Sequence, residues 1–99
     1  MNLTNNEIQI LQNFFARKPV KKAYLFGSYA RNGADKHSDI DLLVELDYSK
    51  QIGLGFVQMH LDLEEILHRK VDLVCDDSLS KYIRPYVDKE KILIYEGAV

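Results

Sequence analysis

Two aspartates separated by a single residue are the first candidates for chemistry in this sequence. Asp41 belongs to a segment over 40–46 in which apolar residues alternate as they do in a strand, and Asp39, just before it, is expected to point to the same side. Residues two apart in a strand share a face and have Cα atoms about 6.6 Å apart, so both carboxylates can approach one cation. Two such charges repel by about 2 kcal/mol at an effective dielectric of about 20. A divalent cation with oxygen ligands, such as Mg²⁺, would offset that repulsion.

A third aspartate, Asp72, lies between apolar residues in a strand expected over 71–75. A carboxylate among buried neighbours is unfavourable unless it is paired, protonated or bound to a metal. Three aspartates on one face of a sheet would make a site for one or two Mg²⁺ ions. Each residue also has a simpler interpretation: Asp39 as a cap or turn residue, and Asp72 as the ion-pair partner of Lys70 or Lys22.

A Gly27-Ser28 pair follows an apolar run over 23–26 that we expect to be a buried strand. Glycine lets the backbone approach a ligand closely, and exposed amides at the start of a short helix, expected over 28–32, favour anions. The Ser28 hydroxyl can donate one further hydrogen bond to a phosphate oxygen. Such pairs are common at strand ends, but beside two metal-binding aspartates the pair indicates a triphosphate site, with Mg²⁺ bridging carboxylates and phosphates.

Hydrophobic periodicity predicts the elements that must position these residues. Thr4 and Glu7 have the spacing of a capping box, so a helix begins there, and Pro19 ends it. A long amphipathic helix is expected over 54–68, with Leu54, Val57, Leu61 and Ile66 or Leu67 at helical intervals.

The C-terminal third adds a further helix and a strand. Pro85 interrupts an apolar pattern and is expected to open a fresh helical turn, and a short last strand is expected over 92–95. We expect Tyr82 and Tyr86 in the core, with an aromatic surface for a partner as the alternative. Alternating helices and strands predict an α/β fold, with helices packed on a small sheet.

Composition limits the classes of protein that the chain can represent. With 99 residues, of which 46% are hydrophobic and 28% charged, it is expected to form a single domain over 1–99. A net charge of −2 gives no long-range attraction for nucleic acid, so no direct nucleic-acid binding is expected. The single cysteine, Cys75, excludes an internal disulfide and fits a reducing compartment. No signal peptide or membrane span is expected, so we predict a cytoplasmic protein without membrane contact.

The spacing Gly27-Ser28-x₁₀-Asp39-x-Asp41, within LFGSYARNGADKHSDIDLLVEL, resembles the motif of the polymerase-β-type nucleotidyltransferase superfamily. The short length and the sequence after Asp41 are similar to its minimal members (MNT), antitoxins that pair with HEPN-domain ribonuclease toxins. The resemblance covers about Ala23 to Glu96. It implies a polymerase-β-like palm, an α+β fold with a small mixed sheet and helices packed on it.

The resemblance also implies a role for each site residue. Asp39 and Asp41 would hold the catalytic Mg²⁺, and Asp72 would complete the metal site or accept the proton from the attacking hydroxyl. Gly27 and Ser28 would bind the triphosphate of ATP.

Arg31 matches the arginine of the family's glycine-serine motif, where it would contact a phosphate or pack the short helix. Asn32 stands where many relatives have glycine, with Gly33 following, so we expect a small change in the turn.

Three functional hypotheses follow from this resemblance. The first is an enzyme that transfers AMP from ATP to a hydroxyl, a tyrosine hydroxyl above all, of a partner HEPN toxin in a hetero-oligomer. The second is an antitoxin that neutralises the toxin by binding alone. The third is modification of a small molecule, against which stands the absence of the helical domain that larger superfamily enzymes use to hold an acceptor.

Overall fold

The computed structural model describes residues 3–35 and 37–97, which form one mixed sheet with helices on both faces. The helices and strands, in chain order, are α1 Asn5–Ala16, β1 Val20–Phe26, β2 Ile40–Leu46, α2 Gly55–Leu67, β3 Val71–Cys75, α3 Arg84–Glu90 and β4 Ile92–Glu96. Single 3₁₀ turns over Gly27–Tyr29 and Asp76–Ser78 follow β1 and β3.

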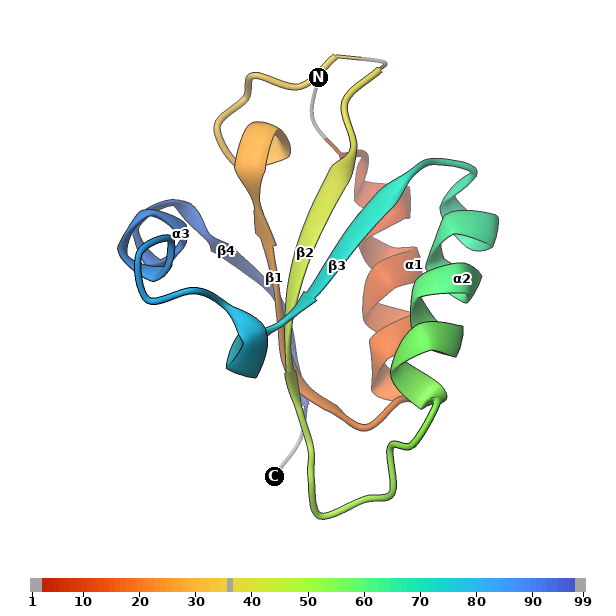
Figure 1. Cartoon of the computed structure of the whole chain (residues 1–99). Coiled ribbons are helices and arrows are strands. Elements are labelled where there is room, and N and C mark those ends of the chain that lie inside the picture. Colours follow the sequence, from red (N-terminus) through yellow and green to blue (C-terminus); the bar gives the residue numbers. More distant parts are fainter. Residues whose placement is uncertain (1–2, 36, 98–99) are drawn as a thin grey trace.

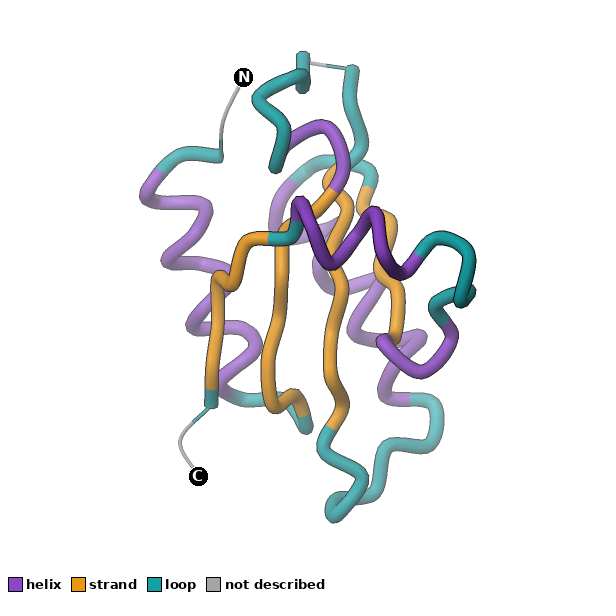
Figure 2. The backbone as a smooth tube through the Cα atoms, turned by 90° about the vertical axis from the view of Figure 1, so that its left-hand side faces the viewer, coloured by secondary structure: helices purple, strands orange, loops and turns teal. Residues whose placement is uncertain are grey.

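The four strands are arranged in the order β3-β2-β1-β4. β1 pairs antiparallel with both β2 and β4, whereas β2 and β3 are parallel. α1 and α2 cover one face of this sheet, and α3 lies across the other (Figure 1; Figure 2). The expected α+β fold, with a small mixed sheet and packed helices, is confirmed.

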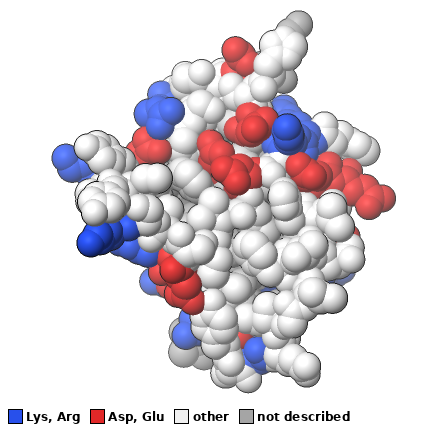
Figure 3. Space-filling model, in the orientation of Figure 1, with Lys and Arg blue, Asp and Glu red and all other residues white. Residues whose placement is uncertain are grey.

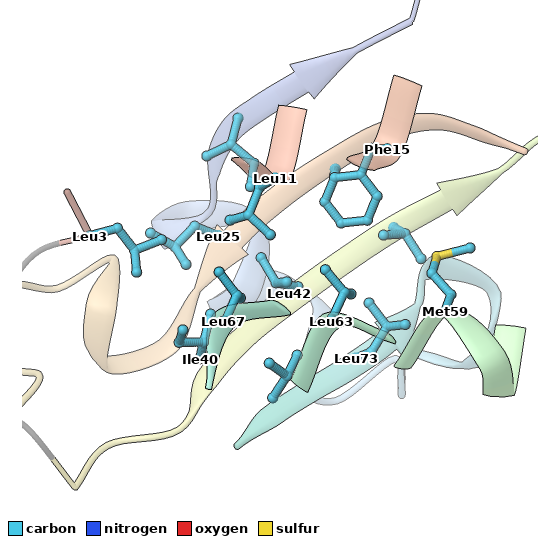
Figure 4. Close-up of a cluster of buried hydrophobic side chains, with 14 of the residues drawn as sticks. Leu3, Leu11, Phe15, Leu25, Ile40, Leu42, Met59, Leu63, Leu67 and Leu73 are labelled. Atoms are coloured by element: carbon cyan, nitrogen blue, oxygen red, sulfur yellow. The ribbon is translucent and has the colours of Figure 1, made fainter. Parts of the chain in front are cut away.

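The main core lies between the sheet and the two helices α1 and α2 (Figure 4). On β2 the alternating residues Ile40, Leu42 and Val44 are fully buried in it, as the sequence pattern predicts. Leu43, on the opposite side of β2, is also fully buried, because α3 lies across that face. The central strand that carries Asp41 is therefore covered on both faces.

The boundaries of α1 agree with the sequence-based expectation. Thr4 Oγ1 accepts a hydrogen bond from the Glu7 amide at 3.1 Å, and Glu7 Oε1 accepts one from the Thr4 amide at 3.0 Å. This capping box satisfies two amides that a helix start would otherwise leave unpaired. The helix ends at Ala16, before Pro19.

Two expectations about burial are wrong. α2 buries Met59, Leu63 and Leu67. Of the expected apolar positions, Leu67, the alternative to Ile66, is buried as expected, whereas Leu54, Val57, Leu61 and Ile66 are exposed. The helix has two apolar stripes. The stripe with Leu54, Val57 and Leu61 faces outward, and the stripe with Met59, Leu63 and Leu67 packs on the sheet. Tyr82 and Tyr86, expected in the core, are each 74% exposed. On α3 it is Val87 that is buried in place of Tyr86, and Tyr82 lies in the turn before this helix.

The short helix expected over 28–32 is a 3₁₀ turn over Gly27–Tyr29. Asn32, with φ of 59°, takes the left-handed conformation that ends the turn, in place of Gly33. Within the described ranges, no helix is both long enough and apolar enough to cross a membrane.

Replacing Leu63 with alanine should lower the free energy of unfolding by about 3 kcal/mol, because it leaves a cavity beneath α2. Leu61→Ala on the same helix is the matched control and should change stability by less than about 0.5 kcal/mol, since Leu61 is 55% exposed. Urea denaturation followed by circular dichroism measures both. Equal losses would contradict the packing described.

Candidate active site

The three aspartates named above lie at one end of the sheet, where β1 ends and β2 and β3 begin. Asp41 is the register partner of Phe26 on β1 and of Asp72 on β3. Register partners in neighbouring parallel strands are about 4.8 Å apart and point to the same face, so the side chains of Asp41 and Asp72 emerge next to each other. Asp39 directly precedes the first residue of β2.

Asp41 carries the electrostatic consequence of this arrangement. Burial, followed by repulsion from Asp72 and then Asp39, raises the pKa of Asp41 from its usual 3.8 to about 6, although Arg31 acts in the opposite direction. The negative charges of the three aspartates therefore act on one another. The ionised form of Asp41 is disfavoured unless a cation is nearby.

Neither simpler interpretation of the aspartates is found among the described residues. Asp72 makes no ion pair with them, and Lys22 instead contacts Glu96, with 3.4 Å between Nζ and Oε2. The turn role considered for Asp39 is filled by Asp35, whose Oδ1 accepts a hydrogen bond from the His37 amide at 2.8 Å. Asp39 and Asp72 are exposed and remain open to a ligand.

The chemistry of these residues fits a hard divalent cation. They offer carboxylate oxygens, the ligands that Mg²⁺ prefers, and a nearby cation would favour the ionised form of Asp41, whose pKa is raised by burial and by the neighbouring aspartates. Several acidic side chains gather on the upper half of the face shown in Figure 3. Among residues 3–35 and 37–97, no three acidic, histidine or cysteine side chains already stand close enough to enclose an ion. Side-chain rotation would have to complete such a site.

Gly27 is required by the position of Asp41. Its φ is +71°, in the left-handed region, and a Cβ at this position would lie 2.9 Å from Asp41 Cγ and overlap the carboxylate. Any larger residue would therefore displace Asp41. The Gly27 amide is already used, since it donates to Glu90 Oε1 at 2.9 Å. Gly27 thus gives the aspartate room, while its amide donates to a carboxylate from α3.

Ser28 and Arg31 follow in the same turn. No hydrogen bond joins the Ser28 hydroxyl to any residue that the structure describes, so this hydroxyl can donate to a ligand. The Arg31 guanidinium contacts Glu90, with 2.8 Å between Nη1 and Oε2. Tyr29, buried to 3% exposure, anchors the turn in the core, and its hydroxyl accepts a hydrogen bond from Arg69.

Glu90 is the residue at this site that sequence reasoning missed. Burial alone would raise its pKa, but the hydrogen bonds from Arg31 and from the Gly27 amide hold the pKa below its usual value, so Glu90 is ionised. It is the last residue of α3 and lies between two lysines, which is typical of a solvated helix end. No local pattern identifies it, because its partners are 59 and 63 residues away in the chain.

α2 fixes the start of β3, and with it Asp72. Glu64 Oε2 accepts a hydrogen bond from the Val71 amide at 3.0 Å, and His60 Nε2 lies 2.7 Å from the Val71 carbonyl oxygen. Val71 is therefore held at both backbone polar groups. His60 acts here as a structural hydrogen-bonding residue.

Comparison with known proteins gives consistent matches over nearly the whole chain. Residues 8–98 match the family model described as "Polymerase beta, Nucleotidyltransferase". "Putative protein adenylyltransferase MJ0435" of Methanocaldococcus jannaschii is 38% identical over 73 residues, covering 74% of this chain and 77% of that protein. "Protein adenylyltransferase MntA" of Thermococcus cleftensis is 35% identical over 75 residues, covering 76% and 75%. A crystal structure of a mutant MntA toxin–antitoxin complex is similar with a TM-score of 0.66 and 27% identity, covering 92% of this chain and 71% of that chain.

Replacing Asp41 with asparagine should raise the free energy of unfolding at pH 7, measured without divalent cations. Because the folded-state pKa is about 6 and the unfolded value 3.8, ionised Asp41 costs folding energy that is fully present above pH 6 and disappears as the pH falls through this range. Since Asp41 is only half-buried, we expect a gain of about 1 kcal/mol.

Urea titrations of both proteins from pH 7 to pH 4 measure this gain, which should shrink as the pH falls. Asp88→Asn is a control of opposite sign, since its hydrogen bond from Lys91 holds the pKa of Asp88 below its usual value. An Asp41→Asn protein less stable than wild type at pH 7 would contradict the raised pKa of Asp41.

Proposed function

The chain belongs to the polymerase β nucleotidyltransferase family, as one of its minimal members, and we propose that it transfers AMP from ATP to a hydroxyl group of a HEPN ribonuclease toxin. The observation that carries this proposal is the position of Asp39, Asp41 and Asp72 at one end of the sheet, beside the Gly27-Ser28 turn. Nucleotidyl transfer needs carboxylates that hold cations and a turn that holds phosphates.

The relatives support the choice of acceptor. The Thermococcus cleftensis protein is named a protein adenylyltransferase, which favours a protein acceptor. The structural neighbour is a toxin–antitoxin complex, which favours a toxin as the partner in a hetero-oligomer. We propose that the reaction takes place in the cytoplasm, where ATP is available.

Each residue of the site has a role in the proposed reaction. Mg²⁺, when bound by Asp39, Asp41 and Asp72, supplies positive charge that offsets the charge of the triphosphate. The Ser28 hydroxyl donates a hydrogen bond to a phosphate oxygen, and Arg31 contributes its remaining guanidinium N–H groups. The acceptor oxygen forms a bond to the α-phosphorus while the bond from that phosphorus to pyrophosphate breaks. Asp72 takes up the proton that the acceptor hydroxyl loses.

The openness of the site fits a large acceptor. Asp39 and Asp72 are both exposed, so a side chain on the surface of a folded partner can reach the carboxylates. A tyrosine hydroxyl is the acceptor we propose, because a long, rigid side chain can extend from the partner's surface into an open site. The partner would then provide part of the surface that holds the acceptor in line with the α-phosphorus.

Replacing Asp41 with asparagine should reduce AMP transfer by about 1000-fold or more, because a neutral amide at this central position weakens the hold on the cations. Mass spectrometry of the co-expressed toxin, after incubation with ATP and Mg²⁺, measures the added AMP. Asp62→Asn is the matched control, since Asp62 lies on α2 and its one side-chain hydrogen bond with a described residue is the one that it accepts from Gln58. This variant should transfer AMP at the wild-type rate.

The same assay separates catalysis from neutralisation by binding. The double variant Asp39→Ala/Asp41→Ala should still bind the toxin but fail to modify it, so cells that express both should stop growing. Full neutralisation by that variant, or an unmodified toxin after incubation with wild type, would replace the proposed enzyme with an antitoxin that acts by binding.

A further inference from the structure

We infer that Glu90 is a positioning residue for the nucleotide: its carboxylate holds the Gly27 amide and the Arg31 guanidinium where Ser28 and Arg31 can bind the triphosphate. The inference rests on the proposed function and adds to it a residue outside the aspartates and the glycine-serine turn. Glu90 acts through Gly27 and Arg31 and need not touch the nucleotide.

The two oxygens of Glu90 have separate partners. Oε1 accepts from the Gly27 amide at 2.9 Å, and Oε2 accepts from Arg31 Nη1 at 2.8 Å. Hydrogen bonds to an ionised carboxylate are short and roughly twice as strong as neutral ones. One side chain therefore fixes both ends of the turn over 27–31 to the end of α3.

Burial shows which of the two charged groups faces the ligand. The Glu90 side chain is 22% exposed, whereas the Arg31 side chain is 59% exposed. Arg31 has five N–H donors, and its bond to Glu90 uses one of them. Glu90 thus holds the guanidinium from the less exposed side, and the other N–H donors of Arg31 remain available to an anion in solvent.

Without Glu90, the Arg31 guanidinium would have another carboxylate to approach, that of Asp41. Arg31 and Asp41 flank the same glycine, since the Arg31 amide donates to the Gly27 carbonyl oxygen at 3.1 Å and the Asp41 carboxylate lies where a Cβ of Gly27 would stand. A guanidinium that moved onto Asp41 would take the carboxylate needed for the cation and would leave the phosphates without a partner. Glu90 prevents this by offering Arg31 a closer partner.

An alternative is that Glu90 imitates a phosphate and must leave when ATP binds. The two interpretations predict opposite changes in nucleotide affinity when Glu90 is removed. Removing a competing anion would tighten nucleotide binding, whereas removing a positioning residue would weaken it. The low exposure of Glu90 favours the positioning role. A carboxylate that lies behind the guanidinium does not occupy the open side where ATP would approach.

Isothermal titration calorimetry with a non-hydrolysable ATP analogue and Mg²⁺ tests the inference on the full chain. Glu90→Gln should weaken binding about tenfold, because a misplaced Arg31 loses contact with the phosphates. The double variant Glu90→Gln/Arg31→Gln should bind no more weakly than Arg31→Gln alone, since Glu90 acts through Arg31. In transfer assays, Glu90→Gln should raise KM for ATP more than it lowers kcat.

Asp88→Asn is the matched control on the same helix. It removes a 2.8 Å ion pair with Lys91 and should bind the analogue as wild type does. Thermal melts establish that each variant is folded. If Glu90→Gln does not fold, Glu90→Asp takes its place, since it keeps the charge but is one methylene too short to reach both partners, and it should show the same weaker binding.

Several results would overturn the inference. Unchanged or tighter binding by Glu90→Gln, or a loss that adds fully to that of Arg31→Gln, would show that Glu90 does not position Arg31. If the wild-type chain and Glu90→Gln bind the analogue equally well, this inference is contradicted and the proposed function is not. A wild-type chain that binds no analogue contradicts the proposed function, and this inference with it.

Discussion

Repulsion among three carboxylates at one end of the sheet is the interaction on which the rest of the site depends. The parallel register of β2 and β3 places Asp41 beside Asp72, and Asp39 adds a third charge immediately before β2. Burial, together with this crowding, disfavours the ionised form of Asp41 and raises its pKa to about 6. Proteins keep an unfavourable arrangement of this kind where function requires it. Under the proposed function, a bound divalent cation would offset this repulsion.

The surrounding fold is arranged so that the carboxylates cannot move apart. β2 is buried on both faces, so Asp41 cannot shift along or out of the sheet. α2 holds the backbone of Val71 beside Asp72 through His60 and Glu64. Most of the hydrophobic core, on the far face of the sheet, is devoted to keeping β2 in place under the α1 and α2 helices (Figure 4). Stability gained in that core offsets the cost incurred at the site.

Local patterns in the sequence predicted the elements, because their causes are local. The capping box at Thr4, the alternation in β2 and the glycine-serine turn each involve residues within a few positions of one another. The buried face of α2 was mispredicted because the helix has two apolar stripes, and only the position of the sheet decides between Leu61 and Leu63. The aspartates were found by their spacing, whereas Glu90 was missed because it acts across 63 residues of chain.

Gly27 lies between two carboxylates, with Asp41 against its Cα and Glu90 at its amide. This has an evolutionary consequence, because the identities of positions 27 and 41 are linked by sterics. A lineage that keeps aspartate at position 41 is confined to glycine at position 27. Once drift replaces Asp41 with a smaller residue, that steric restriction is lifted and only the left-handed backbone still favours glycine. Descendants that have abandoned catalysis should therefore lose the aspartate before the glycine.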